Sequence, residues 1–215
     1  MENDYFCEMK SHEVILIGAG GHALSLAEFA REDIIGYLAN EENASMPGKW
    51  LGTDDLASDW IKEGKDFHVS FVYAGWPKMD KREKLIKLYE SLGANFASLI
   101  SDTAIVTPNT KMGNGVAVMA GAIINRATIG NHVIVNSGAI VEHDCIVGNN
   151  TFVGPGAVVG GFTEIGNNCF IGLGAKIGNG LKIGNNITVA MGAVVNKNLE
   201  EPGIYHGFPL KRFKI

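Results

Sequence analysis

The sequence predicts a small α/β unit followed by a parallel β-solenoid of six-residue repeats. Three observations lead to this fold class. An aliphatic residue recurs at every sixth position through the second half, a glycine-rich turn joins a predicted strand to a predicted helix near the beginning, and 28 glycines accompany only 8% aromatic residues. Many glycines with few large side chains are typical of tight turns around a narrow interior.

The α/β unit is predicted to span residues 13–102, after a polar tail of residues 1–12. Strand–helix–strand order indicates a small parallel sheet. The expected elements are a strand at 13–18 (EVILIG), an amphipathic helix at 24–32, strands at 34–38 and 68–75, a helix at 81–93 that ends at Gly93, and a strand at 96–100 that leads into the repeats.

The turn after the first strand reads Gly18-Ala19-Gly20-Gly21-His22-Ala23. Glycines at this spacing let a backbone and a helix N-terminus approach an anion, although they can also simply turn a strand into a helix. About 90 residues supply one half of a dinucleotide fold, so this half-Rossmann-like unit favours a nucleoside diphosphate over NAD. The position of a ribose-binding acid falls near Asn40, which is a poor match but remains a candidate substrate contact.

The repeats run without a break from Ile129 to Val195 and continue upstream to Val106, with one five-residue step before Ile129. The fourth residue after each aliphatic position is small or apolar. A period of six suits a short strand plus a corner, with both positions facing one core, so that three hexads form a coil of about 18 residues. The solenoid is predicted over residues 103–200, and residues 201–215 form a C-terminal tail.

Composition and cysteine use exclude several classes of protein. A formal charge of −5 disfavours a broad nucleic-acid or anionic-membrane surface. The beginning lacks the pattern of a signal peptide, and no apolar run approaches the roughly 20 residues that span a bilayer. Cys145 and Cys169 both occupy inward positions on different faces, so a disulfide or nucleophilic role is not expected, and the thiols fit a reducing cytoplasm.

Four features together carry a resemblance: GAGGHA, an α/β unit of about 90 residues, hexads that contain Glu142-His143-Asp144, and a closing GFPLK. From Glu13 to about Lys211 the chain resembles the hexapeptide-repeat sugar acetyltransferases. The resemblance is to the subfamily that acylates nucleotide-linked 4-amino-4,6-dideoxy sugars, and sialic acid O-acetyltransferases are close relatives. It implies a left-handed parallel β-helix, a homotrimer, and acetyl-CoA as co-substrate.

The resemblance also assigns roles in catalysis. It makes His143 the general base and Asp144 the acid that orients it, while Glu142 either supports them or only aids solubility. Imidazole, with an ordinary pKa of about 6.5, can take the proton of an attacking amine. A carboxylate on the other ring nitrogen fixes the tautomer.

Binding residues follow from the same resemblance. Gly18, Gly20, Gly21, His22 and Asn40 are the candidate contacts to the nucleotide sugar. The candidate CoA contacts are Phe152, Gly161, Gly172, Gly207, Pro209, Lys211 and Arg212. Relatives commonly carry a second histidine where this chain has Phe152, so an acyl group larger than acetyl is possible. His132 is expected to be solvated, and no metal site is predicted.

The sequence therefore predicts a cytoplasmic N-acetyltransferase that moves an acetyl group from acetyl-CoA to the 4-amino group of a UDP- or dTDP-linked 4-amino-4,6-dideoxy sugar. Two alternatives stay open. One is an O-acetyltransferase of a sialic acid or related sugar, and the other is a non-catalytic protein that binds a nucleotide sugar or CoA.

Overall fold

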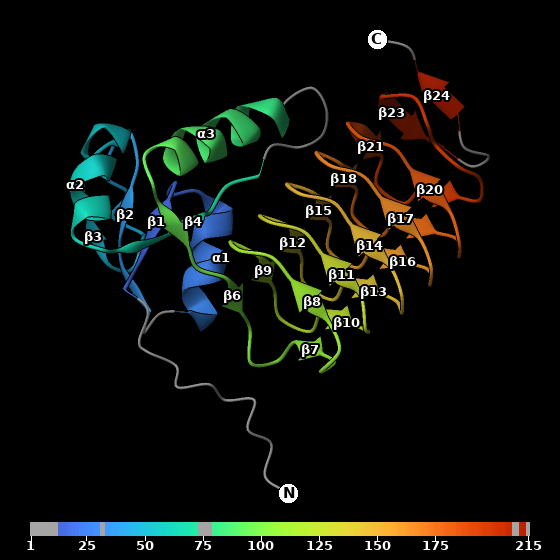
Figure 1. The fold of residues 1–215 in the computed structure, drawn as a ribbon, viewed down its shortest axis with the longest axis horizontal. Coiled ribbons are helices and arrows are strands. Elements are labelled where there is room, and N and C mark those ends of the chain that lie inside the picture. Colours follow the sequence, from blue (N-terminus) through green and yellow to red (C-terminus); the bar gives the residue numbers. More distant parts are fainter. Residues whose placement is uncertain (1–12, 31–32, 73–78, 208–210, 214–215) are drawn as a thin grey trace, which may run out of the picture. The chain divides into compact units, whose positions relative to one another are not determined.

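A computed structural model describes residues 13–30, 33–72, 79–207 and 211–213, without the side chains of 211–213. The chain forms two compact units (Figure 1). The first comprises the residues up to Phe71 together with Tyr89–Ala97, and the second comprises Val72–Leu88 and Ser98–Ile215. Residues 79–88 therefore group with the repeats, whereas the sequence assigns them to the α/β unit. The functional boundary after residue 102 stays a prediction.

The α/β unit contains one five-stranded parallel sheet in the order β3-β2-β1-β4-β5. Its core is formed by the apolar strand residues and by α1, whose buried residues are Ala23, Leu26 and Ala27. The strands are β1 (Val14–Ile17), β2 (Ile34–Leu38), β3 (Lys49–Trp50), β4 (Asp66–Val69) and β5 (Asn95–Phe96), and the helices are α1 (Gly21–Phe29), a 3₁₀ turn η1 (Asp54–Leu56) and α2 (Ala57–Lys62).

Most predicted elements of this unit are present, with shifted ends. α1 begins at Gly21 instead of residue 24, and β4 begins at Asp66 instead of residue 68. The predicted strand at 96–100 is two strands, because Asn95–Phe96 pairs with β4 while β6 (Leu99–Ile100) pairs with β9 of the repeats. The short elements β3, η1 and α2 were not predicted.

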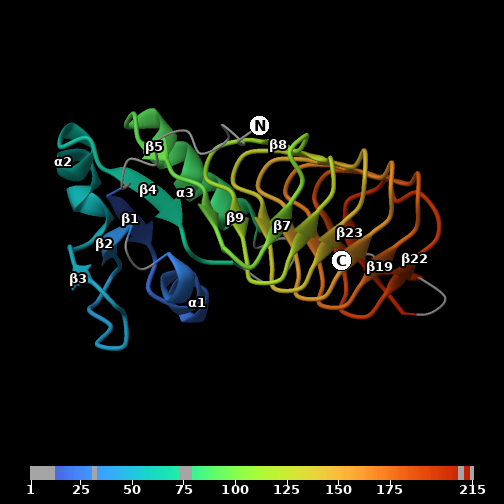
Figure 2. The same cartoon turned by 90° about the horizontal axis from the view of Figure 1, so that it is seen from below.

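The repeats form a left-handed parallel β-helix with three faces, whose stacked coils are visible in Figures 1 and 2. Face 1 contains β7 (Ile105–Val106), β10 (Ile123–Ile124), β13 (Ile140–Val141), β16 (Val158–Val159), β19 (Lys176–Ile177) and β22 (Val194–Val195). Face 2 contains β8 (Lys111–Met112), β11 (Thr128–Ile129), β14 (Ile146–Val147), β17 (Glu164–Ile165) and β20 (Lys182–Ile183).

Face 3 holds β6 and the strands β9 (Ala117–Val118), β12 (Ile134–Val135), β15 (Phe152–Val153), β18 (Phe170–Ile171), β21 (Ile187–Val189), β23 (Gly203–His206) and β24 (Lys211–Phe213). The predicted C-terminal tail thus continues this sheet. β23 pairs parallel to β21, and β24 turns back antiparallel to β23.

The hexad register predicted from the sequence is confirmed. The second residue of each two-residue strand from Val118 to Val195 is buried, as are the predicted inward residues Ala139, Cys145, Thr151, Ala157, Thr163, Cys169 and Ala175. The inward threonines satisfy their hydroxyls within the coil, since Thr151 Oγ1 donates to the Gly166 carbonyl at 2.9 Å and Thr163 Oγ1 to that of Gly178 at 2.8 Å.

Glycine follows the aliphatic residue in many hexads because the next coil comes very close. A Cβ on Gly148 would lie 2.6 Å from the Gly166 carbonyl carbon and 2.7 Å from Asn167 Oδ1. That asparagine oxygen accepts a hydrogen bond from the Asn149 backbone at 2.7 Å, and Asn131 and Asn149 are joined in the same way at 2.8 Å. The Gly-Asn pairs therefore form a ladder along one corner.

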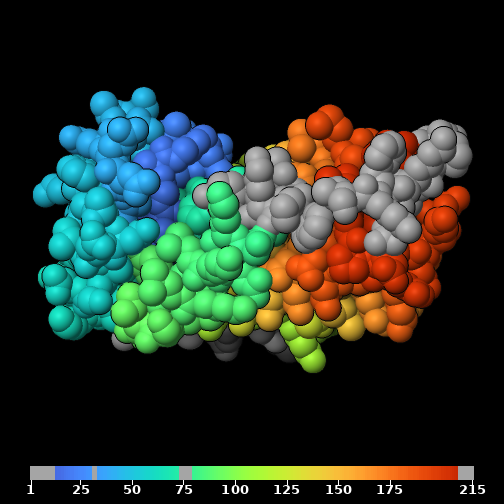
Figure 3. Space-filling model, turned by 90° about the horizontal axis from the view of Figure 1, so that it is seen from above, coloured from blue at the N-terminus to red at the C-terminus, as the bar shows by residue number. Residues whose placement is uncertain are grey.

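Helix α3 (Met79–Ser91) is attached to the β-helix through its first turns. Arg82 is buried, and its Nη1 donates to the His132 carbonyl at 3.0 Å and also to Asn150 Oδ1. Asn168 Nδ2 donates to Glu83 Oε2 at 3.0 Å. In the space-filling view the green surface of this helix adjoins the yellow to orange coils (Figure 3).

The expectation that His132 is solvated is wrong, because His132 is only 4% exposed. Burial and the nearby Arg82 charge lower the pKa of His132 to about 4, and burial lowers the pKa of Arg82 to about 9. Among the described helices none is long and apolar enough to cross a bilayer.

Candidate active site

His143 lies at the corner between faces 1 and 2, the His143 corner, which comprises residues 142–145 and the residues at the same position in the other coils. Val141 and Cys145 on either side face the core, so the three residues between them turn outward. The His143 side chain is 44% exposed. The prediction that Glu142, His143 and Asp144 project from the solenoid is therefore confirmed in its geometry.

Asp144 holds the imidazole from its neighbouring position. His143 Nδ1 lies 3.0 Å from Asp144 Oδ2. Because an ionised carboxylate only accepts hydrogen bonds, Nδ1–H is the donor, and Nε2 is then the basic nitrogen of the neutral ring. Asp144 reaches this orientation with φ 60°, a left-handed conformation that aspartate tolerates better than most residues.

Arg126 is a member of the site that sequence reasoning missed. Its Nη2 donates to Asp144 Oδ2 at 2.6 Å, so one carboxylate oxygen serves both the guanidinium and the imidazole. These two contacts, that of Arg126 first, hold the pKa of Asp144 below its ordinary value. The signal was present in the sequence, because Arg126 stands one coil of 18 residues before Asp144.

The coil beneath His143 has a shorter corner. Thr128↔Ile146 and Ile123↔Ile140 pair across the two coils. Residues 125–127 therefore face residues 142–145, and this is where the five-residue step falls. Asn125 alone corresponds to Glu142 and His143, and its Nδ2 lies 3.4 Å from Glu142 Oε2.

On the other side of the imidazole lie Gly161 and Phe162. A Cβ on Gly161 would be 2.8 Å from His143 Nε2 and 2.9 Å from Cε1, so the ring packs against the glycine backbone. The Phe162 ring meets the imidazole edge to face, with centroids 5.0 Å apart and planes at 89°. The backbone N–H of Phe162 donates to the His143 carbonyl at 2.9 Å.

Cys145 is turned away from this surface. Its thiol is buried and donates to the Gly160 carbonyl at 3.2 Å, and burial raises its pKa. Burial likewise raises the pKa of Cys169 to about 11. Both thiols are therefore protonated near neutral pH and inward-facing, as the repeat register predicts.

The predicted CoA residues lie on several parts of the second unit, and their role stays a prediction. Phe152 is buried on face 3 and stacks on Phe170 with centroids 4.8 Å apart. Residue 172 has room only for glycine, because a Cβ there would lie 2.5 Å from the Met191 nitrogen. Gly207 is exposed with φ 88°. Pro209 and the side chains of Lys211 and Arg212 lie outside the described part of the chain.

In the first unit the glycine-rich turn lies at the carboxyl end of β1. Gly18 has φ 106°, and a Cβ there would meet Phe71 Cδ1 at 3.1 Å, whereas a Cβ on Gly20 or Gly21 would meet nothing within 4 Å. The exposed backbone of Gly20 and Gly21 begins α1, which is the arrangement that accepts a phosphate.

The other predicted sugar contacts are His22, which follows this turn in the sequence, and Asn40, which follows the strand next to β1. His22 is half-buried on α1, and Asn40 is exposed two residues beyond β2, the strand that pairs with β1. Sequence reasoning missed Asn43, whose Nδ2 donates to the Ala19 carbonyl at 2.7 Å and fixes the turn. Whether these residues bind a nucleotide sugar stays a prediction.

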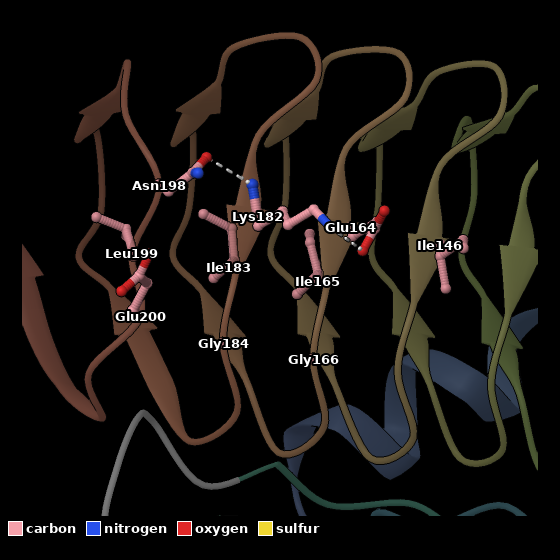
Figure 4. A pocket seen from close by; sticks show the side chains of 10 residues that line it. All are labelled: Ile146, Glu164, Ile165, Gly166, Lys182, Ile183, Gly184, Asn198, Leu199 and Glu200. Carbon is pink, nitrogen blue, oxygen red and sulfur yellow. Dashed lines mark hydrogen bonds and ion pairs between the residues drawn. The ribbon is translucent and has the colours of Figure 1, made fainter.

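A groove of about 420 Å³ lies on the outer side of face 2. Lys182 crosses it with Nζ 3.4 Å from Glu164 Oε2, and its backbone donates to Asn198 Oδ1 (Figure 4). The groove is lined by Ile146, Glu164, Ile165, Gly166, Lys182, Ile183, Gly184, Asn198, Leu199 and Glu200, which include none of the predicted site residues. Within the described residues, no group of three His, Cys, Asp or Glu side chains is arranged to hold a metal ion.

Comparison with known proteins gives matches over the repeats and over the whole fold. Residues 126–161 match the bacterial transferase hexapeptide family (six repeats), and residues 163–197 match the hexapeptide repeat of succinyl-transferase. No curated protein matches the chain in sequence.

Solved structures match nearly the full length. PerB from Caulobacter crescentus, in complex with CoA and GDP-perosamine, is 30% identical, with 94% of this chain and 97% of that chain covered and a TM-score of 0.83. The acetyltransferase domain of PglB from Neisseria gonorrhoeae FA1090, in complex with acetyl coenzyme A, is 28% identical over 94% of this chain and 99% of that chain, with a TM-score of 0.83.

A second structure of this PglB domain matches with a TM-score of 0.85 at 28% identity. The likeness thus extends over both units, and it includes the repeats that carry His143. The chain therefore belongs to the hexapeptide-repeat sugar acetyltransferases, in the subfamily that acylates nucleotide-linked 4-amino-4,6-dideoxy sugars, and it is an acyl-CoA-dependent sugar N-acyltransferase.

Proposed function

We propose that this enzyme transfers an acetyl group from acetyl-CoA to the 4-amino group of a UDP- or dTDP-linked 4-amino-4,6-dideoxy sugar, with His143 as general base. The observation that carries the proposal is the His143–Asp144 contact of 3.0 Å on an exposed corner of the β-helix. It leaves Nε2 to accept a proton, which is the arrangement that an amine nucleophile needs.

The reaction is a direct displacement. The lone pair of the sugar N4 attacks the thioester carbonyl carbon, and Nε2 of His143 takes one proton from the nitrogen as the N–C bond forms. The C–S bond then breaks, and the sulfur of CoA leaves with that proton from the imidazolium. Asp144 stabilises the transient imidazolium and keeps Nδ1 as the donor.

An acyl-enzyme is not part of the proposal, because the described thiol two residues from His143, that of Cys145, faces the core. That thiol is buried and has a raised pKa, so it lacks both access and thiolate character. Acetylated protein trapped after reaction with acetyl-CoA, or ping-pong kinetics, would argue against direct transfer.

The nucleotide sugar is assigned to the glycine-rich turn of the α/β unit. The exposed Gly20 and Gly21 backbone at the beginning of α1 suits the pyrophosphate, and the short unit has one such turn. The relative from Caulobacter crescentus holds GDP-perosamine, so a GDP-linked sugar belongs among the acceptors tested beside UDP- and dTDP-linked ones.

A homotrimer is proposed for the working enzyme. Face 1 presents apolar side chains outward at five of six coil positions, with only Lys176 breaking the series. Such a largely apolar face is typical of a surface that packs against further copies of the chain. The apolar residues are Ile105, Ile123, Ile140, Val158 and Val194. The cytoplasmic location stays a prediction.

The test is mass-spectrometric detection of acyl transfer from acetyl-CoA across UDP-, dTDP- and GDP-linked 4-amino sugars, their 4-hydroxy counterparts and a sialic acid. We expect an amide product with one nucleotide series only. An ester product instead would support the O-acetyltransferase alternative, and binding without turnover would support a non-catalytic protein.

The role of His143 is tested with His143→Ala, and Asp144→Asn is the companion variant. Loss of the base should lower kcat by roughly 10²- to 10⁴-fold. The melting temperature should stay nearly unchanged because the side chain projects from the coil. Near-normal turnover by His143→Ala would remove this residue from the mechanism.

A further inference from the structure

Phe162 occupies a backbone position that does not suit it. Its φ is 61°, in the left-handed region, where a bulky side chain is strained. In three other coils this position of the His143 corner is also left-handed and holds Arg126, Asp144 and Gly180. Elsewhere in the described chain, the left-handed residues other than glycine are His132, Asn150, Asn168 and Asn186. A glycine or asparagine at 162 would relieve the strain, so folding does not explain the phenylalanine.

Burial does not explain it either. Phe162 is 63% exposed, although it is a large aromatic residue on the outside of the coil. A side chain that is both strained and exposed contributes little to the stability of this chain. Such outliers gather at binding and catalytic positions, where the contact to a ligand compensates for the strain.

The ring lies directly beside the proposed base. It meets the His143 imidazole edge to face at 5.0 Å, while Asp144 is engaged with Nδ1. An acceptor whose amine lies about 3 Å from Nε2 has this apolar ring within reach of the atoms next to the amine. In a 4-amino-4,6-dideoxy sugar, C6 is a methyl group separated from N4 only by C4 and C5.

We propose that Phe162 is a specificity-determining residue, on which the C6 methyl group of the acceptor sugar packs while N4 approaches His143. The inference rests on the proposed function, since it takes N4 as the nucleophile. A 6-hydroxyl group at the same place would lose hydrogen bonds to water without gaining a partner from the ring. The ring thus favours 6-deoxy acceptors over 6-hydroxy acceptors.

The experiment compares steady-state kinetics for a nucleotide-linked 4-amino-4,6-dideoxy sugar and its 6-hydroxy counterpart at saturating acetyl-CoA. The wild-type enzyme should favour the 6-deoxy sugar by roughly 10- to 100-fold in kcat/KM. In Phe162→Asn the preference should fall to within about threefold. The KM for acetyl-CoA should not change, and the melting temperature should stay equal or rise.

Two controls accompany the variant. Phe162→Leu keeps an apolar side chain at the corner and should retain most of the preference. Met191→Asn changes another exposed apolar residue, at the corner between faces 3 and 1, and should leave the preference as in the wild type.

Four outcomes would overturn the inference. They are an equal preference in the wild type, an unchanged preference in Phe162→Asn, a raised KM for acetyl-CoA with the preference intact, and dissociation or a lower melting temperature of the variant. The last would make the ring a packing contact between subunits or within the fold. If His143→Ala is inactive and Phe162→Asn keeps its preference, only this inference fails. If the wild type acylates no amino sugar, the proposed function fails.

Discussion

Arg126 Nη2 and His143 Nδ1 converge on the same oxygen of Asp144, at 2.6 and 3.0 Å. Arg126 and Asp144 stand at the same left-handed position of the His143 corner in successive coils, with φ 47° and 60°. The stacking of the coils therefore brings the guanidinium under the carboxylate. Asp144 stays ionised to a lower pH than an ordinary aspartate as a result.

Replacing Arg126 by Met should raise the pKa of Asp144 toward its ordinary value, because its largest stabilising hydrogen bond is lost. The measurement is an NMR titration of ¹³C-labelled aspartate, with Asp144→Asn to assign the signal. We also expect kcat to fall by roughly tenfold, since the carboxylate that orients His143 is less well fixed. An Asp144 titration unchanged by Arg126→Met would show that the guanidinium does not hold the carboxylate in solution.

Gly161→Ala should displace His143 without unfolding the coil. The new Cβ would lie 2.8 Å from Nε2, so the imidazole has to move. A displacement of about 1 Å can lower the rate by roughly 10²-fold, and we expect a loss of that order in kcat with little change in melting temperature.

The control is Gly178→Ala, which lies in the next coil at the position that corresponds to Gly160, and where a Cβ would meet its nearest atoms at 3.4 and 3.5 Å. Both variants should melt close to the wild-type temperature, while only Gly161→Ala loses activity. Equal turnover in the two variants would mean that the imidazole does not need its place against Gly161.

His132→Asn should make the free energy of unfolding depend less on pH in the acid range. The folded pKa of His132 is about 4, below the ordinary 6.5, so between these values the unfolded chain binds more protons. Stability therefore rises with pH across this window and is lost as the pH falls from 6.5 to 4, by up to roughly 3 kcal/mol.

Asparagine suits this position because Asn150, Asn168 and Asn186 take the same left-handed conformation at the corresponding corners. Urea unfolding at several pH values should give a flatter profile between pH 4 and 6.5 for His132→Asn than for the wild type. Parallel profiles for the wild type and His132→Asn would contradict the lowered pKa.

The period of six was sufficient to predict the faces, the inward positions and the outward turn at His143, because each depends only on spacing along one coil. Side-chain contacts between residues in different coils were harder to predict. Arg126 meets Asp144 only through the 18-residue period and the shortened corner, and Phe162 matters only once its ring is placed beside His143.

The attachment of α3 could not be predicted from a pattern. Arg82 lies on a charged helix segment that reads as solvated, and His132 lies in an outward loop position. Both are buried because the first turns of the helix pack on the repeat corner, a contact between residues 50 positions apart in the chain. Only the three-dimensional arrangement turns these polar residues into a buried pair.

The missing residue before Ile129 is absorbed entirely within one bend. The strands on both sides keep their partners, Ile124 with Val141 and Ile129 with Val147, so the deletion leaves no trace in the neighbouring sheets. A β-helix of this kind can therefore gain or lose single residues at one corner without a change in the other coils. The surface next to a reactive side chain can change in this way while the buried core keeps its packing.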